Sequence, residues 1–286
     1  MAIAVVDYQS PSAPLELADS LHQTGFAVLR NHPISWELVE SIYEEWHSFF
    51  LSEAKHRYPF SREKQDGYFA RPVEGTGPSD GSKVNGRDDK EFYHLFAWGR
   101  VPSEVSGRAM MYRTLAMRLG ATLLAWVSES TPKEVADRFA MPLEQTLHGG
   151  EENTLLRILH YPPLGAKRSP TAMRAGAHKD TNLLTILACA SEPGLEVRAG
   201  GTWEQVPWDP ASLIVNGGVM LEMLSHGYYP SVLHRVTAPE GAEGTRPRLA
   251  MPLFLHPSDS TKLDDHQSAA EYLQSRLRVT YPFSTA

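Results

Sequence analysis

The feature that most constrains the fold is a change of pattern near Thr154, after which short apolar runs are separated by Pro, Gly, Ser and Asp. The runs are of strand length and fall at residues 154–161, 183–189, 195–198, 203–206, 212–216, 233–237 and 249–255. Short apolar runs bounded by turn-forming residues are typical of an all-β sandwich or barrel. The pair Gly200-Gly201 lies between two of these runs and predicts a hairpin turn.

The first 150 residues have a mainly helical pattern instead, in which apolar residues recur at helical spacing. Helices are expected at residues 14–22, from Ser35 as a cap, from Ser103 to about Ser130, from Pro132 to Phe139, and at 267–278. The apolar start of the chain, residues 2–7, predicts a strand. Residues 60–100 are rich in loops and predict either a mobile lid or an ordered cover over the core.

His178, Asp180 and His234 predict a metal site. Side chains alternate along an extended chain, so His178 and Asp180 would share one face of a strand. Two imidazoles and one carboxylate, with other coordination positions open, form the facial triad of non-haem Fe(II) oxygenases. The alternative is that His178 and Asp180 only satisfy a hydrogen bond in a core or loop. The apolar, strand-like runs beside both histidines favour the metal site.

Arg248 lies in an apolar segment downstream of His234. A buried charge without a partner is costly, so an arginine at this place predicts an anionic ligand, such as a carboxylate-bearing cosubstrate. The competing interpretation is a structural salt bridge to an Asp or Glu.

Together these motifs resemble the 2-oxoglutarate/Fe(II)-dependent dioxygenases of the isopenicillin N synthase-like branch, in their compact bacterial form. That family carries a His-x-Asp, a distal His and then an Arg-x-Ser, in the order found here. Residues 25–34 match the family's Gly-Phe segment that leads to Asn-His, and residues 155–163 match its strand that ends in Tyr-Pro-Pro. Residues 227–231 match the run before its distal His. The resemblance covers about residues 20 to 258.

The resemblance implies a cosubstrate site beside the metal. The Fe(II) ligands it implies are His178, Asp180 and His234, with O2 as the second cosubstrate. Arg248 would pair with the C5 carboxylate of 2-oxoglutarate, and Tyr161 would hydrogen-bond the same group. The family's Ser two residues after the Arg is Ala250 in this chain, which removes one hydroxyl donor to that carboxylate.

The implied fold is mainly β with flanking helices: a double-stranded β-helix, the jelly-roll barrel also used by cupins, with an N-terminal helical portion. We expect a single oxygenase domain over residues 1–286. Within it, residues 1–150 form the mainly helical portion, 151–258 the jelly-roll core that carries the metal site, and 259–286 a C-terminal helix and tail.

The implied activity is oxidation of a small molecule, with 2-oxoglutarate converted to succinate and CO2. Because Asp180 keeps the third ligand in place, hydroxylation, desaturation or ring formation is favoured over halogenation, which needs that site vacated. Two alternatives stay open. One is an Fe(II) oxidase of the same fold that does not use 2-oxoglutarate, which Ala250 allows. The other is a non-catalytic jelly-roll binding protein.

Composition and charge agree with a cytoplasmic enzyme. Apolar residues make up 42% of the 286, enough for a sizeable core, and no apolar run is long enough to predict a membrane span. The N-terminus is unlike a secretory signal. The net charge of −7 argues against a nucleic-acid partner. The single cysteine, Cys189, predicts a reducing compartment and a core position.

The sequence predicts the place of the primary substrate but not its identity, which could be amino-acid-like or a specialised metabolite. Candidate contacts lie in the loop-rich region and its aromatic run: Tyr68, Phe69, Arg71, Phe92, Tyr93 and His94. Each could equally be a packing or anchoring residue.

Overall fold

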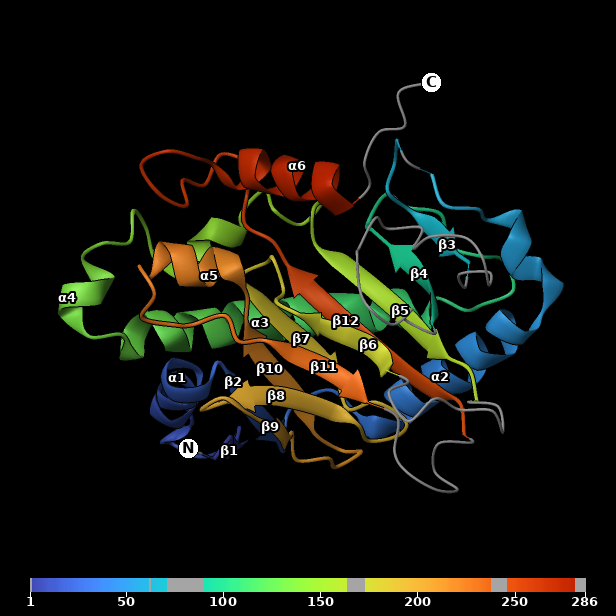
Figure 1. Cartoon of the computed structure of the whole chain (residues 1–286), viewed down its shortest axis with the longest axis horizontal. Coiled ribbons are helices and arrows are strands. Elements are labelled where there is room, and N and C mark those ends of the chain that lie inside the picture. Colours follow the sequence, from blue (N-terminus) through green and yellow to red (C-terminus); the bar gives the residue numbers. More distant parts are fainter. Residues whose placement is uncertain (1, 62, 71–89, 164–172, 238–245, 281–286) are drawn as a thin grey trace.

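The computed structural model describes residues 2–61, 63–70, 90–163, 173–237 and 246–280. Two facing β-sheets form its centre, and helices lie against one of them (Figure 1). The strands are β1 Ala4–Asp7, β2 Phe26–Arg30, β3 Gly67–Phe69, β4 Glu91–Leu95, β5 Leu155–Tyr161, β6 Met173–His178, β7 Leu184–Ala188, β8 Leu195–Ala199, β9 Thr202–Gln205, β10 Leu213–Gly217, β11 His234–Thr237 and β12 Arg248–Leu255. The helices are α1 Ala13–Thr24, α2 Trp36–Leu51, α3 Arg108–Ser130, α4 Lys133–Ala136, α5 Val219–Leu224 and α6 Ala269–Thr280, with 3-10 turns η1 Glu53–Arg57 and η2 Leu143–Leu147.

The larger sheet has eight strands in the order β1-β2-β10-β7-β12-β5-β4-β3, and the smaller has four in the order β6-β11-β8-β9. Among the described residues, β1 and β2 pair in parallel and all other paired strands are antiparallel. Neighbours in a sheet are often distant in sequence, as in a jelly roll. The mainly-β fold class with flanking helices, a double-stranded β-helix, is therefore confirmed.

Alternation along the strands of the large sheet builds two separate cores. On β12, Leu249 and Met251 pack toward the helices, while Arg248 and Ala250 face the space between the sheets. Both faces of the central strands are buried, which explains why their sequences are nearly continuous apolar runs. The strands can therefore direct functional side chains into the space between the sheets while their other face packs against the helices.

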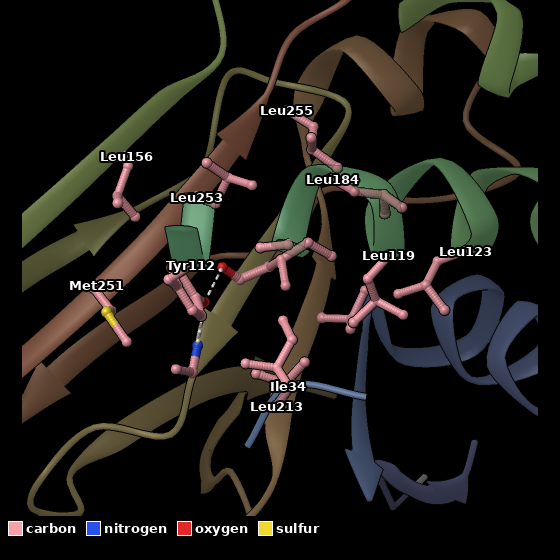
Figure 2. Close-up of a cluster of buried hydrophobic side chains, with 14 of the residues drawn as sticks. Ile34, Tyr112, Leu119, Leu123, Leu156, Leu184, Leu213, Met251, Leu253 and Leu255 are labelled. Atoms are coloured by element: carbon pink, nitrogen blue, oxygen red, sulfur yellow. Dashed lines mark hydrogen bonds between the residues drawn. The ribbon is translucent and has the colours of Figure 1, made fainter. Parts of the chain in front are cut away.

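The core between the helices and the large sheet, here called the outer core, includes the contact of α3 with that sheet (Figure 2). The Tyr112 hydroxyl accepts a hydrogen bond from the Ala188 backbone N–H at 3.1 Å, which ties the helix to β7. Leu119 and Leu123 of the same helix are almost completely buried. Burial of a leucine side chain contributes about 1.5–3 kcal/mol, so α3 is a main source of the stability of the sheet.

The predicted helices form, with two corrected boundaries. Ser35 caps α2, as its Oγ accepts from the Leu38 N–H. The long helix begins at Arg108 and not at Ser103, because the first four-residue hydrogen bond of the segment runs from the Met111 N–H to the Gly107 carbonyl oxygen. The next helix, α4, stops at Ala136, since the bonds that follow it span three residues instead of four. Among the described residues, no helix combines the length and apolar content that a bilayer crossing needs.

All seven predicted runs of the second half form strands, and residues 2–7 contain β1. Gly200 and Gly201 have φ of 54° and 90° and join β8 to β9, which confirms the hairpin. The pattern missed β6, which carries few large apolar residues. In residues 60–100, β3 and β4 extend the large sheet as an ordered cover, and residues 71–89 lie outside the described part.

Candidate active site

The ends of two paired strands bring the predicted ligands together. His178 is the last residue of β6, His234 is the first of β11, and the two are direct cross-strand partners. Asp180 follows β6, and its Oδ1 lies 3.9 Å from His178 Nε2 and 3.6 Å from His234 Nε2. One ligand atom from each of the three residues lies within 4.8 Å of the others.

The hydrogen bonds around the three residues leave one atom of each residue able to coordinate a metal. His178 Nδ1 lies 2.8 Å from the Gly176 carbonyl oxygen, and His234 Nδ1 lies 3.1 Å from that of Val232. A carbonyl can only accept, so each Nδ1 carries the proton and each Nε2 keeps a free lone pair. These lone pairs face the same carboxylate, so the donor set fits a divalent transition metal.

The Asp180 carboxylate is held from behind. Its Oδ2 accepts hydrogen bonds from Thr185 Oγ1 at 2.6 Å and Asn216 Nδ2 at 2.9 Å, while Oδ1 faces the imidazoles. Such outer hydrogen bonds orient a ligand and are a large part of how a site holds its metal. Sequence reasoning missed both Thr185 and Asn216, because nothing in their local pattern marks them.

The three groups set each other's charge. Desolvation and, to a smaller extent, the neighbouring His234 lower the pKa of His178 to about 4, although 48% of its side chain is exposed. Burial opposes a charged Asp180, but the two histidines and the Thr185 hydrogen bond outweigh it and hold its pKa well below the ordinary value. Burial also disfavours protonated His234, yet Asp180 raises its pKa overall. The resting site therefore pairs an ionised carboxylate with a neutral His178.

A narrow cavity of about 70 Å³ between the sheets, here called the inner cavity, connects this site to Arg248 and Tyr161. Arg248 is 3% exposed, and its Nε donates to the Glu192 carbonyl oxygen at 2.9 Å. Its guanidinium lies 5.2 Å from the centre of the Tyr161 ring, its cross-strand partner. Within the described part of the chain, Arg248 Nη1 is buried without a hydrogen-bond partner. None of the ion pairs between described residues involves Arg248, so the alternative of a structural salt bridge has no support there.

A larger cavity of about 420 Å³, here called the outer pocket, opens on the other side of His178 and Asp180. It shares these two residues, Arg157 and Phe254 with the inner cavity. The remaining lining comes from five regions, which are the segment before β3, β4 and the residues after it, the segment after β6, the ends of β5 and β12, and α6: Glu63, Lys64, Gln65, His94, Phe96, Trp98, Asn153, Leu155, Lys179, Thr181, His256, Leu273, Arg276 and Leu277.

Of the substrate-contact candidates, only His94 lines the outer pocket among the described residues. Of the other four described candidates, Tyr68 and Tyr93 belong to the core on the helix side of the large sheet, and Phe69 and Phe92 stack on each other with ring centres 4.3 Å apart. Arg71 lies outside the described residues. The sequence did not single out Arg157, although a charged residue inside the apolar β5 is the same signal that marked Arg248 on β12.

Comparison with known proteins places the chain in a family. Residues 152–257 match the 2OG-Fe(II) oxygenase superfamily, and residues 4–110 match the family described as the non-haem dioxygenase in morphine synthesis N-terminal. A crystal structure from Shewanella oneidensis, provisionally named an oxygenase, is 43% identical, with a TM-score of 0.86 over 97% of this chain and 98% of that one.

Plant enzymes are similar at lower identity. Flavonol synthase/flavanone 3-hydroxylase of Petunia hybrida is 29% identical over 276 residues, covering 90% of this chain and 74% of that protein. Jasmonate-induced oxygenase 1 of Arabidopsis thaliana is 26% identical over 279 residues, covering 93% of this chain and 64% of that longer protein. The chain belongs to the 2OG-Fe(II) oxygenase superfamily and is an enzyme of the Fe(II)- and 2-oxoglutarate-dependent dioxygenase class.

Proposed function

We propose that His178, Asp180 and His234 hold Fe(II), and that Arg248 and Tyr161 hold the C5 carboxylate of 2-oxoglutarate in the inner cavity. The observation that carries this proposal is the buried guanidinium of Arg248, whose Nη1 has no partner among the described residues while the inner cavity links it to the three ligands. A buried charge is costly without a counter-charge, and a carboxylate accepts two hydrogen bonds from a guanidinium.

The protein's own side chains would position the reactants and exclude water. Thr185 and Asn216 fix Asp180, and the backbone carbonyls of Gly176 and Val232 fix the two rings. Apolar side chains of both sheets form the walls of the inner cavity and leave little room for solvent: Phe26, Leu159, Ala175, Leu187, Leu195, Val236 and Ala250. When bound, iron and 2-oxoglutarate supply the oxidising chemistry, in which the cosubstrate becomes succinate and CO2.

The outer pocket is the proposed place of the primary substrate, because His178 and Asp180 form part of its wall. Its volume suits a small molecule and not a folded protein. The similar plant enzyme named for a flavanone supports a small-molecule substrate. With the carboxylate of Asp180 present, we propose hydroxylation, desaturation or ring formation as the outcome. We also propose a cytoplasmic location, which suits the single, unpaired Cys189.

A second candidate function is an Fe(II) oxidase of the same fold that does not use 2-oxoglutarate. The observation in its favour is Ala250, which faces the inner cavity beside Arg248 without the hydroxyl that the Arg-x-Ser pattern supplies. In that case Arg248 would bind an anionic group of the substrate itself.

Calorimetric titration without oxygen separates these functions. Mn(II) replaces Fe(II), and 2-oxoglutarate is titrated into the wild type, the metal-free protein and Asp180→Ala. Binding that needs both Mn(II) and Asp180 is the expected result. Mn(II) binding without 2-oxoglutarate binding would move the enzyme to the oxidases. No Mn(II) binding by the wild type would overturn the metal site and favour a non-catalytic binding protein.

A further inference from the structure

We propose that the primary substrate carries a carboxylate, and that Arg157 binds this group in the outer pocket. This inference rests on the proposed function, because it assumes that the outer pocket holds the substrate. It concerns a second anion site, separate from the one at Arg248.

The two arginines lie at different places on the same interior face. Arg248 is directly opposite Tyr161 in the pairing of β12 with β5, and Arg157 is four residues before Tyr161 on β5. A strand rises about 3.3 Å per residue, so the backbone positions are about 13 Å apart. Ordinary bond lengths separate C1 and C5 of 2-oxoglutarate by only about 5 Å. The cosubstrate is thus much shorter than this separation, and of the two arginines only Arg157 lines the outer pocket as well as the inner cavity, so Arg157 is the one that a ligand in the outer pocket can reach.

Aromatic rings fix the orientation of Arg157. Its guanidinium lies 4.8 Å from the centre of the Phe92 ring and 5.2 Å from that of Phe254. Stacking on rings leaves the in-plane edge of a guanidinium as the part that can form hydrogen bonds. Because a planar fork matches a carboxylate, a rigidly held edge of this kind favours that group over a neutral one.

Among the described residues, Arg157 has a neutral hydrogen-bond partner and no ion-pair partner. Arg157 Nε donates to His94 Nε2 at 2.9 Å, and His94 Nδ1 donates to the Gln65 carbonyl oxygen at 2.9 Å. Burial lowers the pKa of His94 well below its ordinary value, and the charge of Arg157 lowers it further, so the ring stays neutral. Among the ion pairs between described residues, none includes Arg157.

The charge of the outer pocket suits an anion, although the whole chain has a net charge of −7. Besides Arg157 its lining includes Lys64, Lys179 and Arg276, against the acidic residues Glu63 and Asp180. Lys179 is 3.2 Å from Glu222, so the others account for most of the attraction. An excess of positive over negative side chains in a pocket attracts anionic ligands.

The rest of the lining indicates an apolar body. Phe96 and Trp98 stack at 4.8 Å, and Leu155, Leu273 and Phe254 are further apolar groups of the wall. The substrate class that fits is an amphipathic carboxylic acid, with an aromatic or aliphatic body and one carboxylate.

Matched acids and amides test this inference. Benzoate, 3-phenylpropionate and 1-naphthylacetate, each with its primary amide, are titrated into the Mn(II)-loaded protein saturated with 2-oxoglutarate, without oxygen. The variants are Arg157→Gln and, as a control that removes a charge from the same pocket, Arg276→Gln. Binding of 2-oxoglutarate is measured first, so a failure of the proposed function is seen separately.

We expect the wild type to bind at least one acid about 10- to 150-fold more tightly than its amide, from the usual strength of charge-assisted hydrogen bonds. Arg157→Gln should remove this preference with little change in amide or 2-oxoglutarate affinity, and Arg276→Gln should keep most of it. If Arg157→Gln does not fold, Arg157→Met replaces it, because methionine also fits between the two rings. Equal affinity for acids and amides, no binding of any acid while 2-oxoglutarate binds, or an unchanged preference without Arg157 would overturn the inference.

Discussion

Replacement of Arg248 by methionine should separate a cosubstrate-binding role from a structural one. Methionine keeps an unbranched, apolar chain in place of the arginine stem but removes the guanidinium. In the wild type the Nη edge would form charge-assisted hydrogen bonds with the C5 carboxylate of 2-oxoglutarate. Loss of such a pair costs about 2–4 kcal/mol, which corresponds to about 30- to 1000-fold weaker binding.

The stability of the ligand-free protein should change little, because two effects oppose each other. The variant loses the hydrogen bond from Arg248 Nε to the Glu192 carbonyl oxygen, which contributes about 0.5–1.5 kcal/mol. It also removes the buried, unpaired Nη1, whose desolvation costs about 1–3 kcal/mol. We expect a net change within about 1–2 kcal/mol, or a Tm within roughly 2–8 °C of the wild type.

The assay combines calorimetric titration of 2-oxoglutarate into the Mn(II)-loaded proteins with thermal unfolding in its absence and presence. Added 2-oxoglutarate should raise the Tm of the wild type but not that of Arg248→Met. Arg246→Met is the matched control, since Arg246 is exposed and its Nη1 lies 3.5 Å from the Glu192 carboxylate. A 2-oxoglutarate affinity within threefold of the wild type in Arg248→Met would refute the assignment. A large fall in Tm with unchanged affinity would make Arg248 structural.

Two other predictions follow from hydrogen bonds within the barrel and at its edge. Thr185→Val removes one of the two donors to Asp180 Oδ2 without a change in size, and should weaken Mn(II) binding about 10- to 100-fold in a metal titration; unchanged binding would contradict a positioning role. Burial alone would raise the pKa of Glu91, but hydrogen bonds from His160, Tyr68 and Lys55 outweigh the effect of burial and lower that pKa below 4.5. The ionised carboxylate therefore stabilises the fold above pH 4.5, and this stabilisation is lost as the pH falls through the lowered pKa. Glu91→Gln should therefore destabilise the protein near pH 7 and progressively less below pH 4.5 in urea unfolding, whereas an equal loss at all pH values would be evidence against this sign.

Most of the jelly-roll strands could be predicted because they bury large apolar side chains on one or both faces, and the largely exposed β9 because the Gly200-Gly201 hairpin precedes it. The exception is β6, whose Arg174 is buried and whose Ala175 and Gly176 are small. Its strand conformation comes from pairing with β11, a long-range contact that a local pattern does not contain. In the first half, β4 likewise becomes a strand because β5 provides a partner for it, and β4 in turn provides the partner for β3 at the edge of the large sheet.

The ligand residues could be identified by type, since few side chains bind iron and fewer occur in a His-x-Asp spacing. Their supports could not. Thr185 and Asn216 are ordinary strand residues until β7 and β10 pair and direct both toward Asp180. Hydrogen bonds between side chains of different strands depend on register, which is fixed only when the sheet forms.

Arg157 and Arg248 show why a charged residue in an apolar strand indicates a ligand but does not identify it. Both face the interior from paired strands, and the sequence gives each the same signal. Their difference arises from packing: Arg248 lies against Tyr161 in the narrow cavity, whereas Arg157 lies between Phe92 and Phe254 at the wall of the wide one. A small dicarboxylate fits the first environment, and a larger molecule with an apolar body fits the second. The same guanidinium chemistry can therefore select the cosubstrate at one place and the primary substrate at the other, because cavity size decides what accompanies the carboxylate.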